Sequence, residues 1–389
     1  MELIDEIVAN AAEITAWRRD LHMHPETAFE EHRTAQFVAD KLESFGLEVN
    51  RGLARTGVVG TLRAGTGNRA IGLRADMDAL DLHELNDFAH KSRHQGKMHG
   101  CGHDGHTAML LGAAQYLAKA KPFDGIVHFI FQPAEENVAG GKVMVDEGLF
   151  EKFPCEAVYG MHNMPGIDVG KIVVRTGPMM ASADMFFIKI RGTGAHGAYP
   201  HRGVDPIVIG SEIVMALQQI VSRNVDPLES AVVSVCQFNS GHTTNVIPEE
   251  AILTGTTRAF LPEVQDMIEA RMQQIVTGIA AAHGATATLD YQRRYPPTIN
   301  TADETELAAR AAAAVVGRQN VLNNVAPSMG AEDFAWMLQA RPGSYVWLGN
   351  GAGEGSCMVH NPRYDFNDQA IAVGASYWAR LAELALPRG

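Results

Sequence analysis

Four short apolar runs, rich in valine and isoleucine, dominate the first half of the chain: GVVGTL, AIGLRADM, GIVHFIFQP and EAVYGMH. Helical stretches such as HTAMLLGAAQYLAKA separate several of them. Uninterrupted apolar runs of this length, alternating with helices, are typical of strands buried on both faces of a mostly parallel sheet. The first half is therefore predicted to be α/β.

The pattern changes near Ala181, where strands with alternating polar and apolar residues begin. The expected order of elements from there to Tyr295 is β-α-β-β-α-β, which is a complete ferredoxin-like unit. Because a complete unit in mid-chain is best explained as an insertion, residues 182–295 are predicted to form an inserted domain. Residues 1–181 and 296–389 are predicted to form one catalytic, metal-binding domain.

Composition excludes several classes of partner. The formal net charge of -13, with no cluster of lysine and arginine, disfavours nucleic acid and anionic membranes. The first 20 residues carry acids and have amphipathic spacing, which is not the pattern of a signal peptide. With no apolar run near the length of a membrane span, a cytoplasmic protein is expected. The four cysteines lie far apart in the sequence and are expected to be free thiols.

The segment MHGCGHDGHTA holds the densest group of reactive side chains, with Cys101, His103, Asp104 and His106 in a glycine-flanked turn. A thiolate and an imidazole two residues apart can serve neighbouring metal positions. The segment alone leaves two other interpretations open. One is a structural zinc knuckle, and the other is a buried or reactive cysteine beside polar turn residues.

Further donors follow the ends of predicted strands. Glu135 and Glu136 come directly after GIVHFIF, and His162 lies at the end of the next strand. Ligands of open α/β sheets bind at this edge, and two adjacent carboxylates can divide metal binding and proton transfer between them. His360 lies in a later polar loop, after Glu332 and Asp333 in MGAEDF. Together these donors favour a site for two cations over a closed structural zinc site.

Seven motifs occur together and in order: RADMDAL, MHGCGHDGHTAMLLGAA, FQPAEE, GMHNMP, GTGAHGAYPHRGVDPI, SMGAEDF and HNPRYDFND. In these motifs the chain resembles the aminoacylase/carboxypeptidase family of di-metal peptidases, in its branch of hippurate hydrolases and plant auxin-conjugate amidohydrolases. The resemblance extends from about His22 to the C-terminal helix, nearly the whole chain. One departure is DALDLHELNDFAH, where relatives commonly have a proline soon after Ala-Leu.

The resemblance implies a role for particular residues. The implied metal ligands are Cys101, His103, Glu136, His162 and His360. Glu135 is implied as the general base and His196 as the group that stabilises the oxyanion, while Asn245 and Arg258 are implied as substrate-binding residues. Arg74 stands where other branches have a metal-binding histidine, so Asp76 is expected to lie behind the ligands rather than among them.

The resemblance also implies two divalent cations per chain, zinc first and manganese, cobalt or nickel as alternatives. It implies that the inserted domain is a lid or dimerisation domain, through which the chain forms a homodimer or a higher homo-oligomer. The implied activity is hydrolysis of an N-acyl amino acid of the N-acetyl or N-benzoyl type. A dipeptidase or carboxypeptidase of the same family is the alternative enzyme. A binding protein without catalysis and a thiol enzyme with Cys101 as nucleophile are the other hypotheses, and the presence of Glu135 beside a full set of donors disfavours both.

Overall fold

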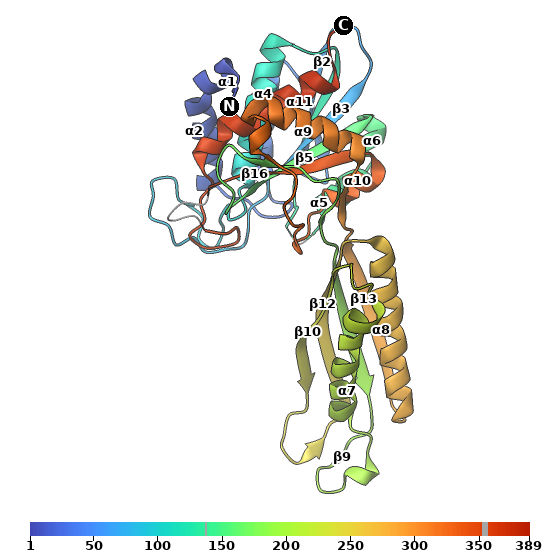
Figure 1. The fold of residues 1–389 in the computed structure, drawn as a ribbon. Helices are drawn as coiled ribbons and strands as arrows, with labels where there is room; N and C mark the ends of the chain where they lie inside the picture. The colour runs from blue at the N-terminus through green and yellow to red at the C-terminus, as the bar shows by residue number, and fades with distance from the viewer. Residues whose placement is uncertain (137, 352–356) are drawn as a thin grey trace. The chain divides into compact units, whose positions relative to one another are not determined.

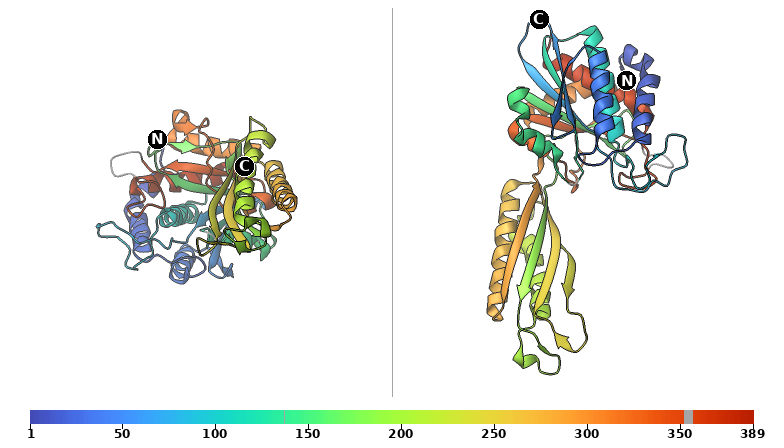
Figure 2. Two further views of the ribbon diagram at one scale, coloured as in Figure 1. Left: turned by 90° about the horizontal axis from the view of Figure 1, so that it is seen from below. Right: turned by 180° about the vertical axis from the view of Figure 1, so that it is seen from behind.

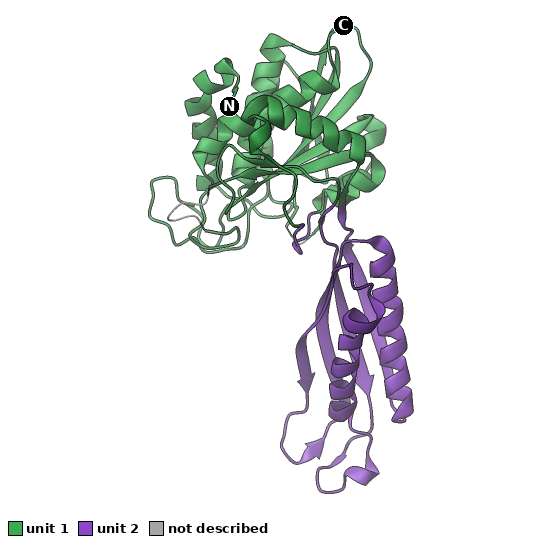
Figure 3. Ribbon diagram, viewed as in Figure 1, with its two compact units in different colours: residues 1–177, 299–326, 333–389 green, residues 178–298, 327–332 purple. Residues whose placement is uncertain are grey.

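The computed structural model describes residues 1–136, 138–351 and 357–389. It divides into two compact units, which Figure 3 shows in separate colours. Unit 1 comprises residues 1–177, 299–326 and 333–389, and unit 2 comprises residues 178–298 and 327–332. The segments β7 (Gly177–Met180) and β14 (Thr298–Asn300) lie where the chain passes from one unit to the other.

Unit 1 is built on an eight-stranded sheet (Figure 1). Its strands, in spatial order, are β1 (Glu48–Leu53), β2 (Gly57–Ala64), β4 (Gly125–Gln132), β3 (Ala70–Asp76), β5 (Ala157–Met164), β16 (Gly343–Gly349), β6 (Ile172–Val173) and β15 (Val321–Leu322). The central pairings β4–β3, β3–β5 and β5–β16 are parallel, whereas β1 and β2 pair antiparallel. The predicted α/β class, with a mostly parallel sheet, is confirmed.

Helices cover both faces of this sheet (Figure 2), and every residue of β3 and β16 is buried. The helices of unit 1 are α1 (Asp5–Ala9), α2 (Ala11–Met23), α3 (His32–Ser44), α4 (His103–Ala120), α5 (Gly140–Asp146), α6 (Leu149–Lys152), α9 (Ala302–Val316), α10 (Ala335–Ala340) and α11 (Ile371–Ala385). The first 20 residues, with their amphipathic spacing, contribute two helices rather than one, since α1 ends at Asn10, which adopts φ -92° and ψ 0°. No helix in the described ranges is long and apolar enough to span a membrane.

Unit 2 contains the expected β-α-β-β-α-β order. Its elements are β8 (Ala183–Arg191), α7 (Pro206–Gln219), β10 (Ala231–Ser240), β12 (Glu250–Ala259), α8 (Pro262–Ala282) and β13 (Thr286–Tyr295), with short strands β9 (Ala195–His196) and β11 (Val246–Ile247). The main sheet is antiparallel, in the order β10-β12-β8-β13. Alternate residues of β8, such as Phe186 and Ile188, are buried against α7 and α8, while Met185 and Phe187 on the other face are exposed. Both helices therefore lie on one face of this sheet (Figure 2).

A buried arginine joins three distant parts of unit 1. Arg18 on α2 is fully buried, and its Nε lies 2.9 Å from Oδ2 of Asp104 on α4. The same guanidinium forms an ion pair with Asp365, which precedes α11. Because Asp104 directly follows His103, this ion pair helps to hold the start of α4 in place.

Replacing Arg18 by methionine should destabilise the protein by about 3–5 kcal/mol, because Asp104 would remain buried without its counterion. Urea unfolding measures the loss. Arg19→Met is the matched control: Arg19 is half exposed and pairs with Asp368 at 2.7 Å, so its loss should cost about 1 kcal/mol or less. Equal effects of the two substitutions would contradict a structural role for the buried ion pair.

Candidate metal centre

The carboxyl ends of three neighbouring parallel strands meet at one edge of the unit 1 sheet. Asp76 is the last residue of β3, Glu135 and Glu136 follow β4, and His162 lies near the end of β5. In sheets of this kind ligands bind at that edge. The local sequence places polar side chains there because each buried apolar strand ends just before or at them.

The turn before α4 brings Cys101 and His103 to the same edge. Gly102 between them adopts φ 93°, in the left-handed region that favours glycine. A side chain at this position would also collide with its surroundings, since a Cβ atom would lie 2.1 Å from Oδ1 of Asn163. The glycine therefore allows the cysteine and the histidine to approach β5 closely.

The structure brings all five residues that the sequence predicts as metal ligands together. Sγ of Cys101 lies 3.3 Å from Nε2 of His162, and Nε2 of His360 lies 3.0 Å from Oε1 of Glu136. Among the described residues, five groups of three side chains offer donor atoms within 4.8 Å of one another. Three of them together contain the predicted ligands: Cys101 with His103 and His162, Cys101 with Glu136 and His360, and His103 with Glu135 and Glu136. The other two are Asp76 with His103 and His106, and Glu135 with Glu332 and Asp333.

The donor set fits cations. It combines a thiol, imidazoles and carboxylates, which are the ligands of zinc and related divalent metals. Nε2 of His103 is buried and makes no hydrogen bond within the part of the chain that the structure describes. Buried polar atoms are usually hydrogen-bonded. An imidazole nitrogen that makes no hydrogen bond and lies beside other candidate ligand atoms is therefore suited to bind a metal ion.

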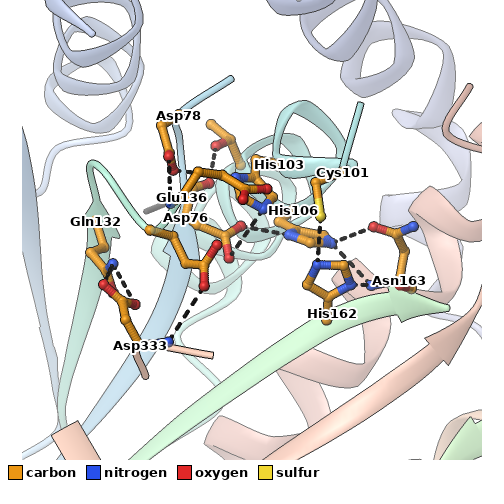
Figure 4. A network of polar contacts seen from close by, with 12 residues as sticks. Asp76, Asp78, Cys101, His103, His106, Gln132, Glu136, His162, Asn163 and Asp333 are labelled. Atoms are coloured by element: carbon orange, nitrogen blue, oxygen red, sulfur yellow. Dashed lines mark hydrogen bonds and ion pairs between the residues drawn. The ribbon is translucent and has the colours of Figure 1, made fainter. Parts of the chain in front are cut away.

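Two aspartates contact the imidazoles of this cluster (Figure 4). Oδ1 of Asp78 lies 3.3 Å from Nδ1 of His103, and its Oδ2 accepts a hydrogen bond of 2.9 Å from the Glu136 N–H. Asp76 lies 2.6 Å from Nδ1 of His106, whose Nε2 is 2.7 Å from Oδ1 of Asn163. A carboxylate that binds the second nitrogen of a histidine fixes the orientation of its ring.

Arg74 lies two residues before Asp76 on β3. Its fully buried guanidinium donates to Asp76 at 2.7 Å, to Asp333 at 3.0 Å and to Gln132 at 2.9 Å. The Asp333 N–H in turn donates to Oε1 of Glu135 at 3.4 Å. An arginine is always charged and cannot bind a cation, so here it offsets the buried acids instead.

Burial and neighbouring charges shift several pKa values in this cluster. Burial opposes protonation of His103, but Asp76 and Asp78 outweigh it and raise the pKa to about 10. Burial, Glu136 and Glu135 raise the pKa of the Cys101 thiol well above its usual range. Burial favours the protonated form of Asp76, yet the charges of His103 and Arg74 hold its pKa well below the usual value. His103 and Cys101 therefore hold protons that bound cations would displace, because metal ligands bind in their deprotonated form.

The sequence analysis named His106 in the reactive turn but gave it no role, and it missed Asp78 and Asn163 as parts of this site. A signal existed for His106 and Asp78. His106 is three residues after His103 on α4 and so lies on the same side of that helix, and Asp78 is two residues beyond Asp76. Asn163 follows His162 and gave no signal of its own, because its contact with His106 arises only when β5 and α4 pack together.

Three predicted residues belong to unit 2. His196 pairs with Val246 in the β9–β11 ladder, and the Asn245 carbonyl accepts a hydrogen bond from the Gly197 N–H at 2.8 Å, so His196 and Asn245 are close neighbours. Arg258 lies near the other end of β12, where it pairs with Val232 and donates to the Thr257 carbonyl at 2.8 Å. Eight residues of extended strand from Glu250 to Arg258 span about 26 Å. One copy of unit 2 therefore does not bring Asn245 and Arg258 together.

Removing the Cys101 thiol should lower the metal content of the purified protein, since the side chain belongs to two of the five groups of candidate donors. Cys101→Ala is expected to lose about half or more of the bound metal in elemental analysis. Cys155→Ala is the matched control, because Cys155 is also buried but lies at the start of β5, away from the donors. Undiminished metal in Cys101→Ala would rule out the thiol as a ligand.

Comparison with known proteins agrees with this geometry. The family model of peptidase family M20/M25/M40 matches residues 72–384. The chain is 42% identical to the hippurate hydrolase of Campylobacter jejuni over 98% of this chain and 99% of that protein, and 39% identical to an N-acetylcysteine deacetylase of Bacillus subtilis over 95% and 96%. The crystal structure of a dinuclear metal-binding M20 peptidase of Bacillus subtilis is 35% identical, covers 97% of this chain and 99% of its own, and has a TM-score of 0.86. The chain belongs to peptidase family M20/M25/M40.

Proposed function

We propose that this protein is an amidohydrolase that cleaves the amide bond of N-acyl amino acids, of the N-acetyl and N-benzoyl type, to a carboxylate and a free amino acid. One observation carries the proposal: Glu135 offers a carboxylate oxygen within 4.8 Å of donor atoms of His103 and Glu136. A base beside two candidate ligands is the arrangement that amide hydrolysis by a metal centre requires. The names of the hippurate hydrolase and deacetylase relatives support the same class of substrate.

We infer that Cys101, His103, Glu136, His162 and His360 hold two divalent cations. Zinc suits a thiolate with imidazoles best, and manganese, cobalt or nickel are alternatives for a mixed donor set. When bound, the cations supply Lewis acidity that polarises a carbonyl and lowers the pKa of water. Asp76 and Asp78 orient His106 and His103 from behind and are not themselves proposed as ligands.

Glu135 is proposed to take a proton from the attacking water and to return it to the leaving amine. Its side chain is 7% exposed, and the Asp333 N–H donates to its Oε1 at 3.4 Å. Asp333 is held in turn by Arg74 and by the Gly141 N–H, at 3.0 and 2.7 Å. A base whose position is fixed before the reaction needs no rearrangement when it accepts the proton.

Glu135→Ala should abolish turnover while the metal content stays near that of the unmodified protein, because Glu135 is the base and not one of the five proposed ligands. Hydrolysis of N-benzoylglycine and N-acetylcysteine should fall at least 10³-fold, within the contribution that general bases make. Glu156→Ala, which removes a carboxylate at the start of β5, should retain full activity. Full activity of Glu135→Ala would exclude the proposed mechanism.

A dipeptidase or carboxypeptidase is the second candidate, since the dinuclear relative of known structure is described as a peptidase. Both reactions attack an amide carbonyl, so the centre itself does not separate them. Rates on N-acyl amino acids and on dipeptides, measured side by side, would decide between the two.

We also infer that the protein forms a homodimer through unit 2. Strand β10 is at the edge of its sheet, and an unpaired edge readily pairs with another chain. Helix α7, which packs against this sheet, carries apolar residues on its outer side: Val208 is 57% exposed and Met215 is 71% exposed. The distance between Asn245 and Arg258 within one copy also favours a substrate site to which a second copy contributes His196 and Asn245.

Met215→Asp should convert a dimer into a monomer in sedimentation velocity experiments, because it places a charge in the proposed interface. Met185→Asp is the matched control: Met185 is 41% exposed on the opposite, helix-free face of the sheet and should leave the dimer intact. A monomeric unmodified protein, or a dimer in both variants, would contradict this interface.

The cytoplasmic location remains a prediction from the sequence.

A further inference from the structure

The turn that carries Glu135 has an unusual backbone. Ala134, directly before it, adopts φ 56°, in the left-handed region that residues with a side chain rarely occupy. Such a conformation persists only where the surrounding structure enforces it. The Ala134 side chain is buried, and so is the strand β4 that leads into the turn. Something in the surroundings must therefore hold this peptide.

A buried carboxylate from the N-terminal part of the chain holds it. Oε1 of Glu31 accepts a hydrogen bond of 2.9 Å from the Ala134 N–H. Its other oxygen accepts a bond of 2.6 Å from the Thr56 hydroxyl, and Oε1 accepts a second one, of 3.1 Å, from the Phe29 N–H. Glu31 is fully buried, so water does not compete for these bonds. The carboxylate is thus fixed by Thr56 and Phe29 and in turn fixes Ala134.

A second carboxylate holds the residue on the other side of Glu135. Oδ2 of Asp78 accepts a hydrogen bond of 2.9 Å from the Glu136 N–H. The Ala134 and Glu136 N–H groups, one residue before and one after Glu135, therefore both donate to buried acids, and the Ala134 carbonyl accepts a hydrogen bond of 2.8 Å from the Gly140 N–H. The two anchors differ in one respect. Asp78 also contacts the candidate ligand His103, whereas the donors that reach Glu31 in the described ranges are not candidate ligands.

We propose that Glu31 is a positioning residue for Glu135, which sets the place of the catalytic carboxylate by holding the Ala134 peptide in its left-handed conformation. This inference rests on the proposed role of Glu135 as the base. Loss of the bond frees the Pro133–Ala134 peptide to rotate and Ala134 to relax toward ordinary dihedral angles, and the change in the Ala134 backbone displaces Glu135, the next residue. A displacement of about 1 Å in a catalytic group can reduce the rate about 10²-fold.

The test compares three substitutions of Glu31 in the metal-loaded full-length protein. Glu31→Leu removes the acceptor, and kcat should fall about 10²-fold while KM and metal content stay unchanged. Glu31→Gln should restore kcat to within a few fold, since its amide oxygen can accept from Ala134 and the Thr56 hydroxyl can turn to accept from its NH₂ group. Glu31→Asp keeps the charge but is one methylene shorter, and should lower kcat as Glu31→Leu does.

Asp124→Leu is the matched control. Asp124 accepts hydrogen bonds from the Thr66 and Gly67 N–H groups, at 2.7 and 2.6 Å, in the turn between β2 and β3. Its loss should lower the thermal midpoint without changing kcat. Unchanged kcat in Glu31→Leu, or an equal fall in Asp124→Leu, would overturn the proposal. If Glu31→Leu does not fold, Glu31→Asp decides in the same way.

The outcome is separable from that of the proposed function. An inactive Glu135→Ala together with a fully active Glu31→Leu would contradict only the positioning role. An active Glu135→Ala would contradict the proposed role of Glu135 as the general base, whatever the activity of Glu31→Leu. A fall in metal content with kcat in Glu31→Leu would show that Glu31 supports the ligands instead, and would overturn the role proposed here.

Discussion

The concentration of buried acids at one edge of the unit 1 sheet is the constraint on which the rest of the site depends. Asp76, Asp78, Glu135 and the partly buried Glu136 are placed there by the ends of strands or by the turns that follow them, and Asp333 by the segment that leads into α10. Charges of one sign are costly to bury unless counterions accompany them. Arg74 offsets Asp76 and Asp333 on one side, and the histidines and any bound cations offset the remainder. The stability of the fold and the binding of cations therefore both depend on how the negative charge of these acids is compensated.

The acids divide into those that face the donors and those that support them from behind. Asp78 and Asp76 fix the rings of His103 and His106, and Glu31 and Asp333 fix the turn and the side chain of Glu135. Each support is a hydrogen bond from a rigid element, a strand end or a helix start. A site assembled from flexible loops would need to order these groups for each reaction, whereas this one has them in place before substrate arrives.

Unit 2 has a different character. It has a small core of its own between one face of its sheet and the helices α7 and α8, and it leaves apolar side chains exposed on the outer side of α7. The family resemblance implies functional roles for three of its residues. His196 and Asn245 lie near one end of β12, and Arg258 lies near the other. Their separation follows from the length of the strand, and it is the basis for the proposed contribution of a second copy.

The sequence by itself determined the α/β class, the β-α-β-β-α-β order of unit 2 and the group of donors at strand ends, because buried apolar runs and the polar residues that end them are local patterns. It also determined which residues to expect as ligands, through motifs that lie in order along the chain. Only the tertiary structure decided which side chains support the site. Glu31 lies about a hundred residues before Ala134, and Arg74 far before Asp333, so their hydrogen bonds exist only once the strands and turns have packed. Contacts between distant segments leave no periodic trace in a sequence, and that is why these residues were not predicted.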